Sequence, residues 1–174
     1  MAGPPFQPKS LVADSSSLIY LAKSSIIRPF LQAFDVTIPP LVLRECVQDG
    51  YPGSNEIERL RKEGRLSVHP TGESVRALTI LRGGEREVIT LFYELRPDGI
   101  LIDDGAGVKA CRRRGIPFIS ALLIPSLLLL KKAIGVKEAE ESLERVVEVG
   151  RYSQRVVFVA RIVLSEACGL QTQS

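Results

Sequence analysis

The chain has 174 residues, enough for one domain that buries a core of its own. A hydrophobic fraction of 45% with 25% charged residues is that of a globular protein and argues against disorder over most of the length. The formal net charge of +3 is too small to indicate a nucleic-acid partner by itself, so each basic patch has to be judged separately.

Cysteine usage and hydropathy exclude further classes. Cys46, Cys111 and Cys168 are far apart and form no CxxC pair, which argues against a disulfide framework and against a thiolate zinc site. No basic and apolar N-terminal signal is seen. The apolar run over residues 116–130 is shorter than the roughly 20 residues of a membrane span and contains two prolines. We therefore expect a cytoplasmic protein with no membrane segment.

Short apolar runs alternate with helical patterns along the chain. Strands are predicted at residues 10–13, 36–38, 66–69, 99–102 and 116–120. Helices are predicted over residues 18–22, 26–34, 41–49, 54–62, 72–81, 85–95, 106–114, 136–149 and 155–167. This alternation is typical of a three-layer α/β/α sandwich with a mostly parallel central sheet. We expect one domain over residues 10–168, a flexible tail over 1–9 and a short tail over 169–174.

Acidic residues follow two of the predicted strands. Asp14 comes directly after the first strand, and Asp103 with Asp104 follows the strand at 99–102. Because the carboxyl ends of parallel strands meet at one edge of a sheet, these carboxylates can converge. Two adjacent anions in one site need a metal ion or a cluster of basic side chains to offset their repulsion. Alternatively, one aspartate caps the following helix while the other faces water.

Two glutamates and a serine can complete such a site. Glu45 lies within the helix at 41–49, where it is an ordinary solvated carboxylate unless it faces the site. Glu85 falls in the first turn of its helix, where the helix dipole favours a carboxylate with or without a metal. Ser16 can cap its helix or orient the Asp14 carboxylate. If the carboxylates converge, this oxygen-only set favours Mg²⁺ or Mn²⁺, and magnesium held in this way commonly acts on phosphate esters.

Other polar features indicate less chemistry. His69, the only histidine, lies at a strand end with no relay partner nearby, and we interpret it as structural. Arg112, Arg113 and Arg114 end the helix at 106–114, where positive charge complements the helix dipole. They are also candidates for phosphate contacts. The many apolar residues of the helix at 155–167 suit docking onto the core or onto a second copy of the chain.

Four short acidic motifs occur in order along the chain: VADSSSLI at 12–19, IP leading to VLRE at 38–45, GEREVITL at 84–91, and LIDD leading to GIP at 101–117. Each is weak alone, but in this order and spacing they resemble the motifs of PIN domains. The resemblance covers about residues 11–130. The segment RYS at 151–153 and the helix after it resemble the tail of a prokaryotic PIN subgroup related to VapC-type toxins.

The resemblance implies a Mg²⁺- or Mn²⁺-dependent ribonuclease. It assigns the metal to Asp14, Glu45, Glu85 and Asp104, with Asp103 as an additional acid; Asp104 is favoured over Asp103 because its distance to the glycine at 115 fits the family better. By the same resemblance Ser16 positions Asp14.

The resemblance also implies partners, namely an RNA substrate, a small antitoxin protein and a second copy in a homodimer. One departure concerns the substrate side of the site. The subgroup usually has glycines and a threonine after the last strand, where this chain has Ser120, Ala121 and Leu122.

Three other functions fit part of the pattern. A phosphatase of the haloacid dehalogenase type also combines a strand-end aspartate with a later Asp-Asp pair, but it needs an acid at the position of Ser16. A receiver-type signalling domain would use Asp14 or Asp103 as its phosphoacceptor. A non-catalytic RNA-binding or RNA-processing assembly module would keep the fold without turnover, because intact ligands do not prove catalysis.

Overall fold

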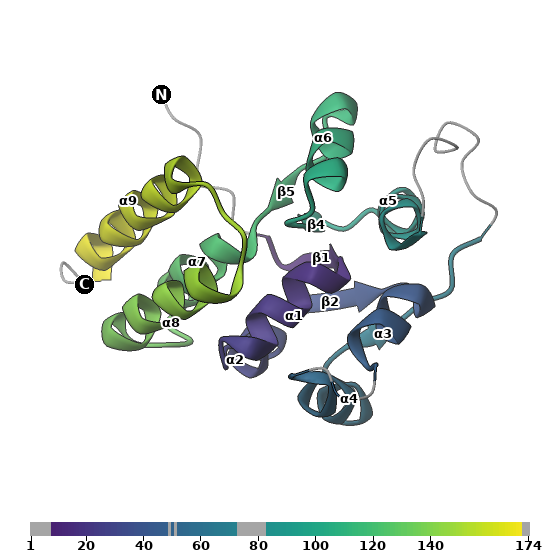
Figure 1. Ribbon diagram of the computed structural model, residues 1–174, viewed down its shortest axis with the longest axis horizontal. Coiled ribbons are helices and arrows are strands. Elements are labelled where there is room, and N and C mark those ends of the chain that lie inside the picture. The colour runs from purple at the N-terminus through teal and green to yellow at the C-terminus, as the bar shows by residue number, and fades with distance from the viewer. Residues whose placement is uncertain (1–7, 49, 51, 73–82, 172–174) are drawn as a thin grey trace.

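The computed structural model describes residues 8–48, 50, 52–72 and 83–171 (Figure 1). The strands are β1 (Ser10–Ala13), β2 (Asp35–Ile38), β3 (Ser67–Val68), β4 (Gly99–Leu101) and β5 (Phe118–Ile119). The helices are α1 (Ser15–Lys23), α2 (Ile27–Ala33), α3 (Pro40–Cys46), α4 (Ser54–Lys62), α5 (Gly83–Leu95), α6 (Gly105–Arg114), α7 (Ile124–Leu130), α8 (Val136–Val149) and α9 (Gln154–Gln171), with a 3₁₀ turn η2 (Ala121–Leu123) before α7.

Several elements differ at their ends from the predicted ranges. Helix α3 ends at Cys46, and not at residue 49 as predicted. The N–H of Val47 closes its last turn by donating to the Leu43 carbonyl at 3.0 Å. Helix α9 continues past its predicted end at 167 to Gln171, whose side chain donates to the Leu129 carbonyl of α7 at 3.0 Å. The helix predicted over 72–81 falls, from residue 73 onward, outside the described residues.

The five strands form one sheet in the order β3-β2-β1-β4-β5, and every neighbouring pair is parallel. Strand β1 is central, with Leu11 paired to Val36 of β2 on one side and to Gly99 of β4 on the other. Its residues Leu11, Val12 and Ala13 are buried, as expected for a parallel strand covered on both faces. The predicted three-layer α/β/α fold is therefore confirmed.

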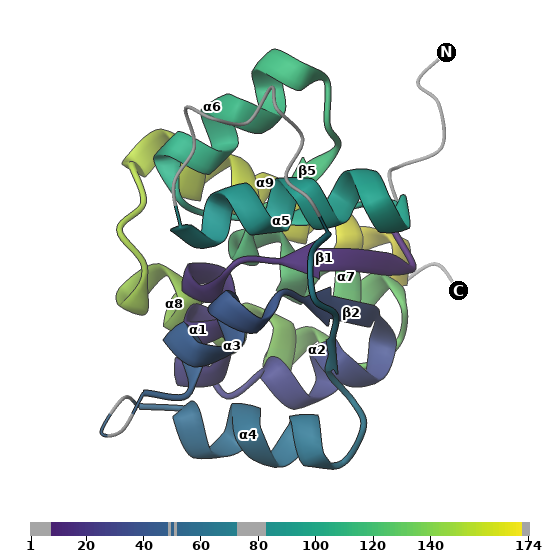
Figure 2. The same cartoon turned by 90° about the vertical axis from the view of Figure 1, so that its right-hand side faces the viewer.

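Helices cover both faces of the sheet. Figure 2 shows α5 and α6 on one side of β1, and α1, α2, α3 and α4 on the other. Helices α7, α8 and α9 pack on one another and form a group of their own in Figure 1, joined to the rest through contacts of α8 with α1 and of α7 with α2. No helix within the described ranges is long and apolar enough to cross a membrane.

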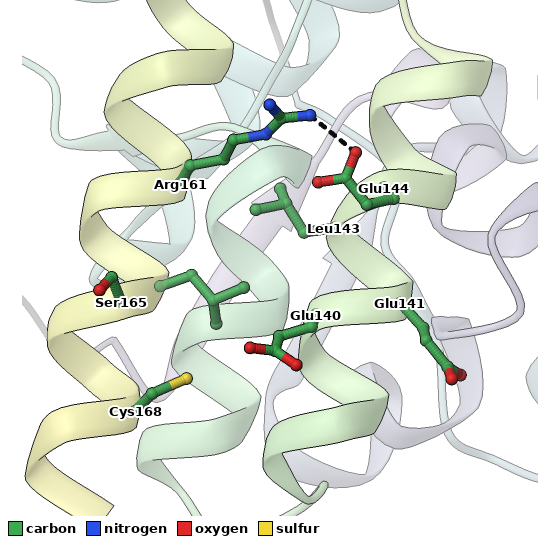
Figure 3. A pocket seen from close by; sticks show the side chains of 8 residues that line it. Glu140, Glu141, Leu143, Glu144, Arg161, Ser165 and Cys168 are labelled. Carbon is green, nitrogen blue, oxygen red and sulfur yellow. Dashed lines mark hydrogen bonds and ion pairs between the residues drawn. The ribbon is translucent and has the colours of Figure 1, made fainter.

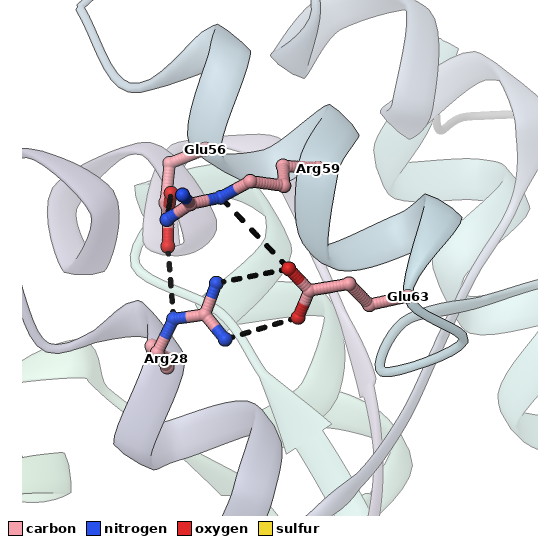
Figure 4. Close-up of polar contacts among 4 residues, drawn as sticks. All are labelled: Arg28, Glu56, Arg59 and Glu63. Atoms are coloured by element: carbon pink, nitrogen blue, oxygen red, sulfur yellow. Dashed lines mark hydrogen bonds and ion pairs between the residues drawn. The ribbon is translucent and has the colours of Figure 1, made fainter.

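Helix α4 is attached to the layer through α1 and α2. Gly53 precedes it with φ of 92°, and a Cβ there would lie 2.6 Å from Ala22 Cβ, so only glycine permits this close approach. Arg28 of α2 lies between Glu56 of α4 and Glu63, the residue that follows α4, with its guanidinium 3.0 Å from Glu63 (Figure 4). These ion pairs are partly exposed and contribute about 1 kcal/mol or less each, so the apolar contacts hold the helix in place.

The strand order creates a switch point between β1 and β4. After β1 the chain moves outward through β2 and β3, and it then returns to place β4 on the other side of β1. Connections therefore leave β1 and β4 toward opposite faces of the sheet, which opens a crevice at their carboxyl ends. Ala13 pairs with Leu101 at this end, so the residues that follow both strands share that crevice.

Candidate active site

Asp14 lies at the carboxyl end of β1 and begins α1. Its N–H donates to the Leu101 carbonyl at 3.0 Å, which extends the β1–β4 pairing by one step. Its Oδ1 accepts from the Ser17 N–H at 2.9 Å, the usual bond of a residue that caps a helix. Only 4% of Asp14 is exposed. The first predicted site residue is therefore a fixed, nearly buried carboxylate.

Asp104 has the corresponding position after β4. Its Oδ2 accepts from the N–H groups of Ala106 at 2.7 Å and Gly107 at 2.9 Å, so it caps α6. The sequence left open whether an aspartate here caps the helix or faces the site. In the structure Asp104 does both, because it caps α6 and lines the pocket described below.

The four carboxylates of Asp14, Glu45, Glu85 and Asp104 line one pocket of about 300 Å³. They come from four segments, the β1–α1 junction, α3, the first turn of α5 and the β4–α6 junction. The remaining lining residues are Ser15, Ser16, Val42, Gly83 and Gly84, and none of the described residues around the pocket is a lysine or an arginine. The pocket therefore concentrates negative charge without a basic side chain to offset it.

Glu45 is held by neighbours rather than by solvent alone. The Ser15 hydroxyl donates to Glu45 Oε2 at 2.6 Å. Gly84, at the start of α5, leaves the space beside this carboxylate open, because a Cβ there would lie 3.1 Å from the same oxygen and 3.4 Å from Val42 Cγ2. A side chain at this point would therefore press on the Glu45 carboxylate and shift it by a few tenths of an ångström.

The crowding of carboxylates changes their proton affinity. Burial raises the pKa of Asp14 to about 7, and the negative charge of Asp103 adds to the effect, although hydrogen bonds from Ser17 oppose it. Burial also raises the pKa of Glu85 to about 7, helped by a hydrogen bond to Asp104. Burial alone would raise the pKa of Asp104, but hydrogen bonds from Glu85 and from the α6 amides outweigh it and lower that pKa. The interaction between Glu85 and Asp104 therefore moves their pKa values apart, upward for Glu85 and downward for Asp104.

Asp103 faces away from this pocket into a cluster of donors. Its Oδ2 accepts from the Ser17 hydroxyl at 2.7 Å and the Ala121 N–H at 3.0 Å. Its Oδ1 accepts from the Tyr152 hydroxyl at 3.0 Å and from the Ser120 hydroxyl. Asp103 thus links β4 to α1, to the start of η2 and to the segment between α8 and α9.

Tyr152 is fixed from two sides. Its ring meets the Tyr20 ring edge to face, with centroids 5.9 Å apart. A Cβ on Gly150 would lie 2.0 Å from the Tyr152 ring, so the turn after α8 needs glycine to bring Tyr152 inward. Burial and the adjacent Asp103 carboxylate raise the pKa of Tyr152, which keeps its hydroxyl protonated as a donor.

Sequence reasoning missed several of these residues. Ser16 lines the pocket, but the hydrogen bonds to Asp14 and Asp103 come from Ser17. Helix capping could have indicated the bond to Asp14, because a capping side chain accepts from the N–H two or three positions later. The segment RYS at 151–153 stood out by its resemblance, but the contact of Tyr152 with Asp103 gave no local signal because the two residues lie 49 positions apart.

The predicted basic patch lies away from the pocket. Arg112, Arg113 and Arg114 form the last turn of α6, roughly 12 Å along the helix from Asp104 at its first turn. The Arg112 guanidinium lies over the Phe118 ring, 5.8 Å from its centroid. These side chains complement the C-terminal end of the helix dipole and can contact only a substrate that extends well beyond the pocket.

The donor set fits a hard divalent cation. Among the described residues, no group of three or more His, Cys, Asp or Glu side chains is close enough to form a complete metal cage. Magnesium does not need one, because it usually keeps several waters and is bound through one or two carboxylates. A pocket lined by four carboxylates, two of them with raised pKa, provides such ligands and gains free energy when a cation offsets their repulsion.

Comparison with known proteins gives one match. A family model described as a PIN domain matches residues 10–166, which is most of the chain. No curated protein and no solved structure matches the chain. The matched range begins at β1 and ends within α9, so it includes the switch-point pocket and the Tyr152 segment.

Proposed function

Because the chain belongs to the PIN domain family, whose members are typically nucleases that use divalent metal ions, we propose that it is an endoribonuclease dependent on Mg²⁺ or Mn²⁺. The observation that carries the proposal is the convergence of Asp14, Glu45, Glu85 and Asp104 on one pocket at the β1–β4 switch point. RNA as the substrate is the specific part of the proposal, and it depends on the resemblance of the acidic motifs to ribonucleases of this family.

One or two of the four carboxylates would bind the cation directly and the others through its waters, and the bound cation would supply Lewis-acid stabilisation of phosphate oxygens and a more acidic water. The chain fixes these ligands through its own bonds. Ser17 orients Asp14, the first amides of α6 orient Asp104, and Ser15 orients Glu45. Ligands fixed in advance lose little conformational freedom on binding.

Glu85 and Asp14 are the two carboxylates that would lose protons when a cation binds. In the cation-free pocket both have a pKa of about 7, so near neutral pH each is protonated part of the time. Metal ligands have to be deprotonated, and cation binding would therefore release protons. Without a cation, a phosphate would meet uncompensated negative charge, so we expect the substrate to bind only together with the metal.

We further propose that the protein is the toxin of a toxin–antitoxin pair, inhibited by a small partner protein. Support comes from the resemblance of the region after Gly150 to the tail of VapC-type relatives. In this chain that region supplies Tyr152, which contacts Asp103 beside the pocket. A partner that displaced Tyr152 would loosen the site, which is one way in which such an inhibitor could act.

Cleavage of a labelled pool of single-stranded RNA tests the enzymatic proposal. Wild type should cleave with Mg²⁺ or Mn²⁺ and not with a chelator, and Asp14→Asn and Asp104→Asn should each abolish cleavage. Asp35→Asn removes an exposed carboxylate at the start of β2 and should leave cleavage unchanged. Cation-independent cleavage, or full activity in both site variants, would contradict the proposal. RNA binding without cleavage by folded wild type would favour the non-catalytic RNA-binding module.

A further inference from the structure

Two hollows that lie outside the active site differ in their charge. The hollow between α8 and α9, of about 480 Å³, is lined by Glu140, Glu141 and Glu144. Arg161, the one cation among the described residues that line it, pairs with Glu144 at 2.8 Å (Figure 3). This first hollow is therefore acidic, and its positive charge is neutralised within the chain.

The second hollow, of about 440 Å³, lies at the amino end of the sheet and brings three cations together. Lys9 precedes β1, Arg65 lies between α4 and β3, and Lys131 follows α7. Asp35, the first residue of β2, is the one carboxylate among the described residues that line it. This second hollow, called the basic hollow below, therefore has an excess of positive charge.

The three cations of the basic hollow form no ion pair within the described part of the chain. Two carboxylates near them have other partners. Asp98 accepts from the N–H groups of Lys9 at 2.8 Å and Ser10 at 2.9 Å, and Glu63 accepts two hydrogen bonds from the Arg28 guanidinium. Like charges gathered in one hollow repel one another, and a bound anion would offset that repulsion.

The basic hollow also restrains one of its cations and adds neutral hydrogen-bonding groups. The ammonium of Lys131 lies over the Phe34 ring, 4.8 Å from its centroid, and this cation–π contact favours one position of the side chain. Thr37 of β2 and Ser67 of β3 are neighbours across the sheet and add their hydroxyls to the wall. The volume of the hollow is within the range of small-molecule sites, about 300–1,000 Å³.

We propose that the basic hollow binds a small phosphorylated anion, such as the diphosphate group of a nucleotide. Three cations that converge from separate segments suit a compact group with more than one negative charge. Phe34 is only 3% exposed, so its ring cannot stack on a base, and we expect the phosphates to be recognised instead. Lys9 lies five residues before Asp14, so roughly 16 Å of extended chain separates this site from the active-site pocket. The proposal does not depend on the nuclease activity.

Calorimetric titration of the full chain with inorganic pyrophosphate and with ADP, at low salt, tests this proposal. A chelator is present throughout, so the carboxylates of the active-site pocket repel the probes and binding reports on another site. Wild type should bind both probes. Arg65→Gln and Lys131→Gln should each raise the dissociation constant about fivefold or more, because each removes a charge-assisted contact to the phosphates.

Two matched variants separate this site from general attraction of anions. Lys132→Gln and Arg113→Gln remove exposed charges that do not line the basic hollow, and they should bind both probes like wild type. No binding by folded wild type overturns the proposal, and so does equal weakening in these two variants. A single-stranded RNA oligonucleotide that binds more tightly than ADP, and is lost in Arg65→Gln and Lys131→Gln, overturns the assignment to a small ligand and makes the hollow a contact for an RNA chain.

Discussion

Replacing Asp14 by Asn should stabilise the cation-free protein at neutral and higher pH, although Asp14 is central to the proposed site. The pKa of Asp14 is about 7 in the fold against an ordinary value of 3.8. Because the folded pKa is the higher one, the fold binds the proton more tightly than the unfolded chain does. The associated stability is present in full below pH 3.8 and is lost as the pH rises through about 7.

The size of the effect follows from this difference in pKa. Each pH unit between the two values is worth about 1.4 kcal/mol, so ionising Asp14 in the fold costs about 4 kcal/mol at the most. Asn keeps the shape of the side chain and can still accept from the Ser17 N–H. Because a neutral acceptor forms a weaker hydrogen bond, this substitution loses about 1 kcal/mol of the gain. The expected gain above neutral pH is therefore about 3 kcal/mol.

Urea unfolding with a chelator at about pH 5 and about pH 8 measures this gain, with Asp35→Asn as the exposed control. Wild type should lose free energy of unfolding between the two pH values, and Asp14→Asn should lose less. The pKa of Glu85 is raised in the same direction in both proteins, so a smaller dependence of the free energy of unfolding on pH remains in Asp14→Asn. If wild type is equally stable at both pH values, or Asp14→Asn is the less stable protein at the higher pH, the reasoning about this carboxylate is wrong.

Three further perturbations test other parts of the structure. Tyr152→Phe removes one of four donors to Asp103 and should lower the free energy of unfolding by about 1–2 kcal/mol in denaturant titrations. Gly150→Ala should cost more, about 2–3 kcal/mol, because its Cβ would lie 2.0 Å from the Tyr152 ring and has to push that ring away. Replacing the arginines at 112–114 by Ala should weaken RNA binding and lower its salt slope by about two, as measured by fluorescence anisotropy.

Matched variants separate these effects from general destabilisation. Tyr93→Phe changes an exposed tyrosine of α5 and should leave stability within about 0.5 kcal/mol of wild type. Removing Arg59, Arg61 and Lys62 of α4 deletes the same charge elsewhere and should leave the salt slope nearly unchanged. An unchanged slope in the α6 variant would remove those arginines from the RNA interface. A Tyr152→Phe protein as stable as wild type would remove the proposed link to Asp103.

The sequence predicted the sheet and the meeting of Asp14 with Asp104 for a physical reason. Both follow short apolar strands, and parallel strands end at the same edge of a sheet. Local patterns did not separate the roles of Asp103 and Asp104, and only the resemblance favoured Asp104 as the ligand with Asp103 as an additional acid. Alternation of side chains along extended backbone sends neighbours to opposite sides, so one enters the pocket and the other enters the cluster. Which is which depends on the register of β4.

Local sequence patterns did not predict contacts between residues that are far apart in the chain. Tyr152 reaches Asp103 only because Gly150 turns the chain inward after α8, and no periodicity encodes that turn. In the same way, Glu45 reads as an ordinary helix carboxylate until α3 packs against α5 at Gly84. Packing between distant segments decided these positions, whereas strand ends and helix caps follow local rules.

Titration of Mn²⁺ into the purified protein by calorimetry tests the central claim most directly, because it asks whether the four carboxylates form one cation site. Wild type should bind Mn²⁺ near neutral pH and release protons, seen as a heat that changes with the buffer's own ionisation enthalpy. Asp14→Asn and Glu85→Gln should each weaken binding by about tenfold or more, while Asp35→Asn should bind like wild type. Mn²⁺ binding that is equally tight in both site variants, or no binding by folded wild type, would contradict the account.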